Sequence, residues 1–384
     1  MQPQKDIGIQ FLEQKGCRTG VPKLKRLGFT LNYECDGNCT YCFAKADLET
    51  KKGSGKEEIS LHEFQEILNQ AIPLGLEEVQ LSGGEPLLKK DIFEFAQTAK
   101  DAGLRTGLFT NGSMLDKKTL KKLKSLKLDW IRIGLGGSSY KKSQKAGRKN
   151  DTKERFERIL KNTKASTEMG FTVGVFTPVT KNNFKDIRAT ARLAKRLGTK
   201  YIIFCNYILL GNKQDARNKM GIREHYKAIE EFLKARKEQN REIDVFAYYG
   251  FFEYLSKNWK ETEAVLKGPC GRERLAFIAN GDVRTCLCTA HKIGSFRKKD
   301  FNLKRIWEGN KLLLEIRKNK RVEPCLHCKR KKICLPCLSS TINTTGKIDS
   351  PPQECPVVRE FFLHKAKMNE KSAIKKALRW NFEE

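Results

Sequence analysis

The amino-acid sequence predicts an α/β fold built around a parallel sheet. From residue 27 to about residue 240, short apolar segments rich in β-branched and aromatic residues alternate with longer segments of helical periodicity. Glycine follows three of the longer segments, at the point where a helix is expected to stop. Six strand–helix units in succession favour parallel strands joined by right-handed crossovers.

The expected elements follow one another in chain order. Strands are predicted where short runs are apolar and β-branched or aromatic, at residues 27–34, 78–82, 105–110, 129–135, 171–177 and 200–207. The first helix opens at Ser60-Leu-His-Glu63, which has the pattern of a capping box. Helices are predicted over residues 60–68, 91–102, 116–126, 153–169 and 183–197, and the three glycines that follow them are Gly103, Gly170 and Gly198.

The pattern changes after the sixth strand. A basic helix is expected over residues 213–240, and an aromatic-rich bridge over 241–269. Cysteine, lysine and short turns dominate the chain from Cys270 to Cys355. The expected division is an N-terminal extension, a strand–helix domain, a cysteine-rich domain and a C-terminal basic helix, over residues 1–25, 26–240, 241–356 and 357–384.

The composition indicates a soluble protein of a reducing compartment, and we expect the cytoplasm. Thirteen cysteines among 384 residues are too few for a disulfide scaffold, and most are bunched in groups such as C-x2-C. Such bunching is typical of metal or redox chemistry. The amino terminus has no apolar signal segment, and no uncharged apolar run approaches the ~20 residues of a membrane helix. We therefore expect no membrane association.

The formal net charge of +31 favours acidic partners. The lysines are scattered over helices, however, and residues 117–127 place six of them beside an apolar stripe of Leu120, Leu123 and Leu126. Neither an arginine-rich arm nor the signature of a nucleic-acid-binding fold is present. A solvated basic face is the favoured interpretation, and nucleic acid is not an expected partner.

Three thiols stand close together in the segment Cys35-Asp-Gly-Asn-Cys39-Thr-Tyr-Cys42, directly after the first predicted strand. Three cysteines on one loop can hold three irons of a [4Fe–4S] cluster and leave the fourth iron open to a small molecule. A structural zinc loop is the alternative. Structural zinc normally takes four protein ligands, and the nearest other thiols, Cys17 and Cys205, lack the paired spacing of such sites.

A second motif follows the next predicted strand. Residues 77–82 run into Gly83-Gly84-Glu85-Pro86, a glycine turn that carries a carboxylate. The two motifs, in this order and at this spacing, resemble the radical S-adenosylmethionine (radical SAM) superfamily. The resemblance implies a partial (β/α)6 barrel with its chemistry at the carboxyl ends of the strands.

The resemblance also implies a cofactor and its contacts. The open iron would chelate the amino and carboxylate groups of S-adenosylmethionine, and the turn at Gly83, Gly84 and Glu85 would contact the amino group. Tyr41 corresponds to an aromatic residue that relatives place against the adenine. A reduced cluster would cleave the cofactor to a 5′-deoxyadenosyl radical, which abstracts hydrogen from the substrate. Ferredoxin or flavodoxin is the expected kind of electron donor.

Two further positions follow from the same resemblance. Asn111 matches a polar residue near the ribose, and Arg148 matches an arginine that pairs with the cofactor carboxylate. The fourth strand departs from the family pattern, because glycine occupies both polar positions of the usual Ser-x-Asp-Gly, at Gly134 and Gly136. Carboxylate recognition by that serine is therefore lost, unless Ser138 or Ser139 replaces it.

The cysteine-rich part of the chain also predicts metal binding. Zinc ribbons are the alternative, but paired C-x2-C units separated by five residues, with a distant Cys-Pro, are closer to ferredoxin-type ligation. The arrangement resembles the SPASM extension, which holds one or two auxiliary [4Fe–4S] clusters. By analogy, an outer cluster would use Cys325, Cys328, Cys334 and Cys355. An inner cluster would use Cys270, Cys286 and Cys337, with Cys288 as a candidate fourth ligand.

Three functions are compatible with these features. The leading hypothesis is a peptide- or protein-modifying radical enzyme, similar to sulfatase-maturating enzymes and peptide maturases, with an acidic peptide or partner protein. The second keeps the radical chemistry but takes a small carboxylate-rich substrate such as a haem precursor. The third is a non-catalytic electron-transfer or nucleic-acid-binding iron–sulfur protein, which would leave the three-thiol segment and the glycine turn without a purpose.

Overall fold

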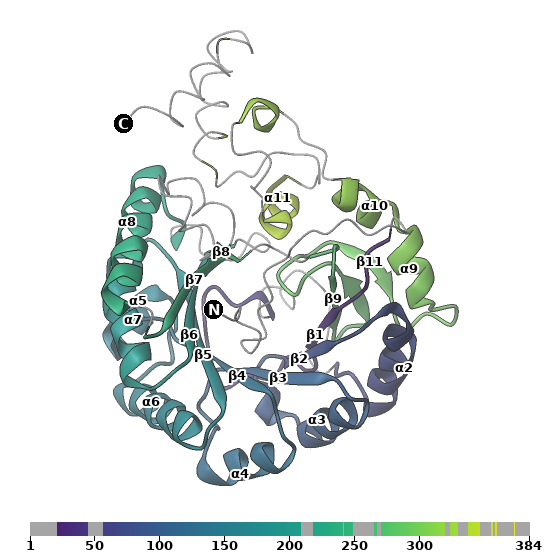
Figure 1. Cartoon of the computed structure of the whole chain (residues 1–384), viewed down its shortest axis with the longest axis horizontal. Coiled ribbons are helices and arrows are strands. Elements are labelled where there is room, and N and C mark those ends of the chain that lie inside the picture. Colours follow the sequence, from purple (N-terminus) through teal and green to yellow (C-terminus); the bar gives the residue numbers. More distant parts are fainter. Residues whose placement is uncertain are drawn as a thin grey trace.

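The computed structural model describes most of the chain between residues 21 and 345. The described ranges are residues 21–44, 57–208, 218–240, 242–248, 265–266, 270–318, 323–328 and 337–345, together with Cys355, Val358 and Ser372. Within these ranges, eleven strands form one curved sheet in the order β11-β10-β9-β1-β2-β3-β4-β5-β6-β7-β8 (Figure 1).

Eight consecutive strands are parallel and lie side by side in chain order. They are β1 (Arg26–Thr30), β2 (Glu78–Ser82), β3 (Arg105–Thr110), β4 (Trp130–Gly134), β5 (Thr172–Val179), β6 (Tyr201–Asn206), β7 (Asp244–Tyr248) and β8 (Val265–Leu266). The first six are the strands expected from the sequence, with ends that differ by a few residues. The predicted α/β partial barrel is thereby confirmed.

Helices cover the convex side of the curved sheet (Figure 1). They are α2 (Leu61–Ala71), α3 (Ile92–Asp101), α4 (Lys117–Ser125), α5 (Tyr140–Ala146), α6 (Lys153–Glu168), α7 (Ile187–Arg196) and α8 (Ile222–Gln239), with short 3-10 turns η1 (Ile72–Leu74), η2 (Pro86–Leu88) and η3 (Phe184–Asp186). The predicted capping box is formed, since Glu63 N donates to Ser60 Oγ at 3.1 Å and Ser60 N donates to Glu63 Oε2 at 2.8 Å. None of the helices in the described ranges is both long and apolar enough to cross a membrane.

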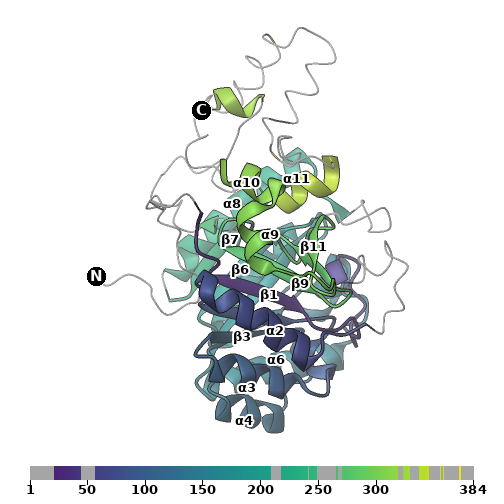
Figure 2. The same cartoon turned by 90° about the vertical axis from the view of Figure 1, so that its right-hand side faces the viewer.

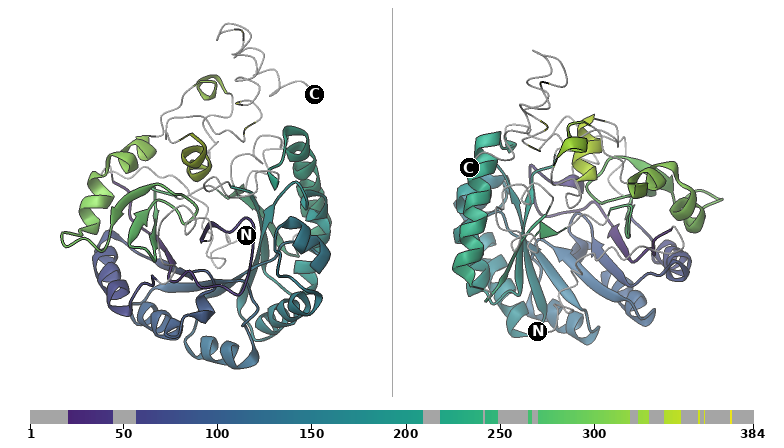
Figure 3. Two further views of the ribbon diagram at one scale, coloured as in Figure 1. Left: turned by 180° about the vertical axis from the view of Figure 1, so that it is seen from behind. Right: turned by 45° about the horizontal axis from the view of Figure 1, so that its top comes forward.

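The cysteine-rich region begins as an extension of the same sheet. Strand β9 (Arg274–Ile278) pairs parallel with β1, and β10 (Asp282–Arg284) and β11 (Lys292–Ser295) add an antiparallel hairpin at this edge (Figures 2 and 3). Phe29 of β1 lies opposite Phe277 of β9, and their ring centroids are 5.3 Å apart. Stacked rings on one face stabilise neighbouring strands. Helices α9 (Leu303–Gly309), α10 (Lys311–Lys318) and α11 (Leu338–Thr345) and the turn η7 (Cys325–His327) follow.

Some expectations for the second half of the chain were wrong. The aromatic-rich bridge contains strands β7 and β8. The side chains of β7 alternate, since Val245 and Ala247 face the helices while Phe246 packs inside the barrel. The basic helix α8 begins at Ile222, since residues 219–221 belong to no helix, and residues 213–217 of the expected helix lie outside the described residues. Helix α5 was not expected. Residues 1–20 and nearly all of the predicted tail helix lie outside the described residues.

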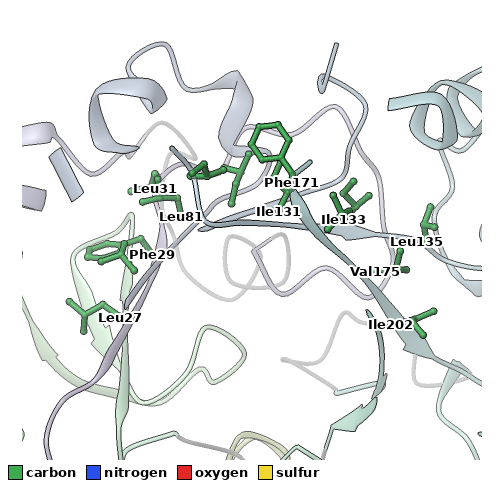
Figure 4. Packing of buried hydrophobic residues seen from close by; sticks show 14 of the residues in the cluster. Leu27, Phe29, Leu31, Leu81, Ile131, Ile133, Leu135, Phe171, Val175 and Ile202 are labelled. Carbon is green, nitrogen blue, oxygen red and sulfur yellow. The ribbon is translucent and has the colours of Figure 1, made fainter. Parts of the chain in front are cut away.

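The hydrophobic core lies between the sheet and the helices. Leu27 and Phe29 of β1, Leu81 of β2 and Ile131 of β4 belong to one buried cluster (Figure 4). These residues alternate along their strands with residues that face the barrel interior. The inward-facing side chains include both polar residues such as Gln80 and Arg132 and a small apolar cluster around Tyr201 and Phe246.

Candidate active site at the carboxyl ends of the strands

The thiol loop, defined here as residues 31–42, leaves β1 against the glycine turn that follows β2. The amide of Gly84 donates to the carbonyl of Asn32 at 2.8 Å. The amide of Glu85 donates to the carbonyl of Glu34 at 2.7 Å. The two sequence motifs, which are separated by some forty residues, therefore form one structural unit that ends at Cys35.

Both glycines of the turn are required by this close approach. A Cβ on Gly84 would lie 2.2 Å from the carbonyl oxygen of Glu34, and one on Gly83 would lie 1.9 Å from Oδ1 of Asn32. Real Cβ atoms essentially never come within 3.0 Å of such atoms. Within the described residues, no donor is hydrogen-bonded to the carbonyls of Gly83 or Gly84. These two acceptors are therefore open to a ligand that carries N–H groups.

The carboxylate of Glu85 points into the protein and ties the glycine turn to the end of β3. It accepts hydrogen bonds from Thr110 Oγ1 at 2.7 Å, from the amide of Asn111 at 2.7 Å and from the amide of Leu87 at 3.2 Å. Glu85 is fully buried. Desolvation raises its pKa to about 7, although the hydrogen bonds from the three donors act to lower it. The side chain thus positions the turn, while the backbone is left to contact a ligand.

Asn111 lies at the predicted end of β3, and its side chain is engaged with the thiol loop. Its Nδ2 donates to Oδ1 of Asp36 at 2.6 Å, and its Oδ1 accepts from the amide of Ser113 at 2.8 Å. The loop and the third strand are therefore joined through Asn111. Contact of this residue with a ribose stays a prediction.

Arg148 is buried beside the thiol loop and has a carboxylate partner within the protein. Its Nε donates to Oδ2 of Asp151 at 2.7 Å, and its Nη1 donates to the carbonyl of Gly134 at 3.0 Å. Tyr41 shares a hydrogen bond with Arg148, and burial raises the pKa of Tyr41 above its ordinary value. The backbone of Cys39 forms an antiparallel bridge with that of Arg148, so the second half of the loop is held here.

The unusual glycines of the fourth strand make room for Arg148. A Cβ on Gly136 would lie 3.0 Å from Cδ of Arg148 and 2.5 Å from Oγ of Ser143. A Cβ on Gly134 would lie 3.3 Å from Nη1 of Arg148. The arginine side chain thus fills the space that side chains at these two positions would need.

The hydroxyls of both serines that could replace the lost family serine have hydrogen-bond partners within the protein. Ser138 donates from its amide and its Oγ to the two carboxylate oxygens of Asp186, each at 2.7 Å. Ser139 caps α5 and accepts from the amide of Lys142 at 3.4 Å. Both hydroxyls stabilise the β4–α5 connection. Replacement of the family serine by Ser138 or Ser139 stays an open prediction.

The donor set of the thiol loop fits a cubane cluster. Desolvation raises the pKa of Cys35 to about 12 and that of Cys39 to about 11. Metal-free thiols therefore stay protonated at neutral pH, and loading of iron must release protons. In the described part of the chain, no three Cys, His, Asp or Glu side chains converge on a single metal ion. A cubane needs no such convergence, because each of Cys35, Cys39 and Cys42 would bind a different iron.

A second group of thiols lies at the edge of the barrel. Cys286 shares thiol hydrogen bonds with Cys270 and with Cys288, and these bonds lower the pKa of Cys286 and raise those of its two neighbours. The turn at Cys288 is held by Asn343 of α11, whose Nδ2 donates to the carbonyl of Cys288 at 2.9 Å. Helix α11 follows Cys337 directly, so the predicted inner-cluster cysteines are brought into one region.

The predicted outer-cluster cysteines are described only in part. Cys325 begins η7, and the amide of Cys328 donates to the carbonyl of Cys325 at 3.2 Å. Cys355 is described as a single residue, and Cys334 lies outside the described residues. Outer-cluster ligation by these four cysteines stays a prediction.

Three residues at the site were not predicted from the sequence. Asp36 binds Asn111, and Asp151 pairs with Arg148. Cys205, at the end of β6, is buried, and its thiol lies 3.8 Å from the carbonyl of Thr177. Asp36 stands inside the three-thiol motif, and that position was the one signal that could have singled it out.

Comparison with known proteins agrees with this geometry. Residues 30–194 match the family model for the radical SAM superfamily. These residues include the thiol loop, the glycine turn and Arg148. The chain therefore carries a radical SAM domain over these residues.

Particular relatives extend over most of the chain. The chain is 25% identical over 342 residues to an AdoMet-dependent heme synthase of Methanosarcina barkeri, covering 85% of this chain and 94% of the relative. It is 28% identical over 315 residues to a PqqA peptide cyclase of Rhizobium meliloti, with 79% of each chain covered. Among solved structures, native anSMEcpe with bound AdoMet has a similar fold, with a TM-score of 0.69 and 17% identity over 92% of this chain and 99% of that one.

Proposed function

We propose that this protein reductively cleaves S-adenosylmethionine and abstracts hydrogen from a side chain of a peptide or protein substrate. The observation that carries the proposal is the union of the thiol loop with the Gly83-Gly84 turn through two short backbone hydrogen bonds. This union brings the loop that carries the three thiols against the turn, whose two glycine carbonyls accept no hydrogen bond within the described residues. A [4Fe–4S] cluster on those thiols would supply the electron for cleavage of the sulfonium C–S bond.

The residues of this chain would bind and orient the cofactor. Cys35, Cys39 and Cys42 would hold three irons, and the carbonyls of Gly83 and Gly84 would accept from the cofactor ammonium group. Arg148 is held in place by Asp151, and its positive charge lies beside Cys39. A reactive radical needs a site from which water is excluded, and the cysteine-rich extension of the sheet would contribute to that cover.

The cysteine-rich region would hold at least one auxiliary cluster that receives the substrate electron. Hydrogen abstraction leaves a carbon radical, and the product needs a one-electron acceptor. The shared hydrogen bonds among Cys270, Cys286 and Cys288 support an inner cluster in which Cys288 is the fourth ligand. With four protein ligands, this cluster would transfer electrons and would not bind substrate.

A peptide substrate is supported by the relatives and by the charge of the chain. The PqqA relative is a peptide cyclase, and a solved structure of anSMEcpe contains AdoMet and a peptide, with a TM-score of 0.67 to this chain. The net charge of +31 would favour an acidic peptide or an acidic partner protein. A low-potential donor of the ferredoxin or flavodoxin kind would reduce the cluster.

A haem precursor is the second candidate substrate. The relative in Methanosarcina barkeri is a heme synthase, and the likeness covers 94% of it. The carboxylates of a haem precursor would suit the positive electrostatic field that the basic chain creates. We retain this candidate because the haem relative and the peptide relative each match more than three quarters of this chain.

The experiment begins with anaerobically reconstituted protein, dithionite and S-adenosylmethionine. We expect 5′-deoxyadenosine by mass spectrometry, and none from a variant with Cys35, Cys39 and Cys42 replaced by alanine. Titrations at low salt then compare a glutamate-rich peptide with iron coproporphyrin III. Binding of the peptide and not the porphyrin supports the leading proposal, and the reverse result supports the second candidate. Absence of 5′-deoxyadenosine from the wild type contradicts both.

A further inference from the structure

The thiol loop is anchored at both ends by backbone hydrogen bonds, but not in the middle. Its first part pairs with the glycine turn, as described above. Its last part is held where the amide of Thr40 donates to the carbonyl of Gly147 at 2.9 Å and the amide of Lys149 donates to the carbonyl of Asn38 at 3.3 Å. Residues 35–37 form no backbone–backbone hydrogen bond with the rest of the described chain.

The side chain of Asp36 supplies the missing anchor. Its Oδ1 accepts from Nδ2 of Asn111 at 2.6 Å. Its Oδ2 accepts from Oγ of Ser113 at 2.6 Å and from Nη1 of Arg155 at 2.6 Å. The three donors come from two elements, because Asn111 and Ser113 follow β3 and Arg155 lies in the first turn of α6.

The carboxylate of Asp36 faces one positive charge, because Nη1 of Arg155 lies 2.6 Å from its Oδ2. The guanidinium of Arg155 is itself buried and also approaches Asp151, with Nε 3.4 Å from Oδ1. Asp151 pairs in turn with Arg148, so one chain of charged side chains joins the loop to the connection between β4 and β5.

We propose that Asp36 is a positioning residue for cofactor cleavage. It fixes the middle of the thiol loop, and with it Cys35, over the carboxyl end of β3. The inference rests on the proposed function and gives Asn111 a different task from the one expected. Asn111 donates to the loop and so helps to align the cluster with the glycine turn, whether or not it also reaches a ribose.

The test compares Asp36→Asn with wild type and with Asp101→Asn, which removes the same charge from an exposed position on α3. Each protein is reconstituted anaerobically, and iron content, thermal stability, midpoint potential of the cluster and affinity for S-adenosylmethionine are measured. Loss of charge-assisted hydrogen bonds is expected to weaken cofactor binding about 10- to 100-fold in Asp36→Asn, with iron content retained. We also expect a shifted midpoint potential, which a purely structural role would leave unchanged. Asp101→Asn should match wild type.

Ser113→Ala provides a milder variant if Asp36→Asn does not fold. It removes one of the three donors and is expected to weaken cofactor binding about 2- to 10-fold. Asp36→Glu keeps the charge and should restore part of the affinity. If Asp36→Asn has the cofactor affinity and midpoint potential of wild type, the inference is overturned and the proposed function is not. If Asp36→Asn does not fold, the same result in Ser113→Ala overturns the inference. A wild-type protein that does not bind the cofactor would overturn the proposed function and the inference together.

Discussion

Substitution of Gly84 by alanine should disrupt the junction on which the site depends. The new Cβ would lie 2.2 Å from the carbonyl oxygen of Glu34, so backbone atoms must separate by at least 0.8 Å to reach the 3.0 Å limit. That carbonyl also accepts the 2.7 Å bond from Glu85, and Gly84 itself donates to Asn32 at 2.8 Å. Relief of the overlap therefore breaks or lengthens two backbone hydrogen bonds.

The expected cost can be stated from these contacts. Overpacking costs about 1–3 kcal/mol, and loss of two backbone hydrogen bonds costs about 1–3 kcal/mol more. For a chain of 384 residues, a loss of this size lowers the Tm by about 3–6 °C. The displacement also moves Cys35 relative to the open carbonyls, so cofactor binding should weaken more than stability does.

The assay pairs thermal unfolding with electron spin resonance of the reconstituted, reduced protein. Gly309→Ala is the matched control, because a Cβ there meets nothing within 4 Å. It should leave the Tm unchanged or slightly raised, since alanine favours a helix more than glycine does. A Gly84→Ala protein with a wild-type Tm and a wild-type response to S-adenosylmethionine would refute the reasoning.

Three further predictions concern single side chains. The pKa of Glu85 is raised to about 7, so its contribution to the stability of the metal-free protein is present at low pH and is lost as pH rises from 4.5 to about 7. Relative to Glu85→Gln, wild type should lose about 3 kcal/mol of unfolding free energy between pH 5 and pH 8 in urea titrations, and parallel profiles would contradict this. Arg148→Met leaves the buried carboxylate of Asp151 with only its longer ion pair to Arg155, and should cost about 3 kcal/mol, the lower end of the range for breaking a buried pair. The added change Asp151→Asn should restore part of this loss, and no recovery in the double variant would count against a buried pair. Asn343→Ala frees the turn at Cys288 and should lower the iron content without changing the response to S-adenosylmethionine, whereas full iron content would show that the turn needs no such support.

The sequence was sufficient for the parts of the molecule that depend on local patterns. Apart from α5, the order of strands and helices from β1 to α7 follows from periodicity and from helix stop signals such as Gly103. The thiol loop and glycine turn could be joined in advance because both follow neighbouring parallel strands. The pairing of β9 with β1 could not be predicted, since it links residues more than 240 positions apart and depends on contacts such as Phe29 with Phe277.

The polar contacts of the site could not be predicted from the sequence for a similar reason. Asp36 lies within a recognisable motif, but its partner Arg155 lies on a helix more than a hundred residues away. The glycines of the fourth strand looked like a loss of function and are explained by the bulk of Arg148. Which polar residues meet depends on the curvature of the sheet, which periodicity does not encode.

Electron spin resonance of the dithionite-reduced protein, before and after addition of S-adenosylmethionine, tests the central claim most directly. Direct coordination of the cofactor to an open iron on the loop of Cys35, Cys39 and Cys42 should change the g-values of one cluster. The change should vanish when these three cysteines are replaced by alanine. A wild-type spectrum that stays the same at saturating cofactor would contradict the account.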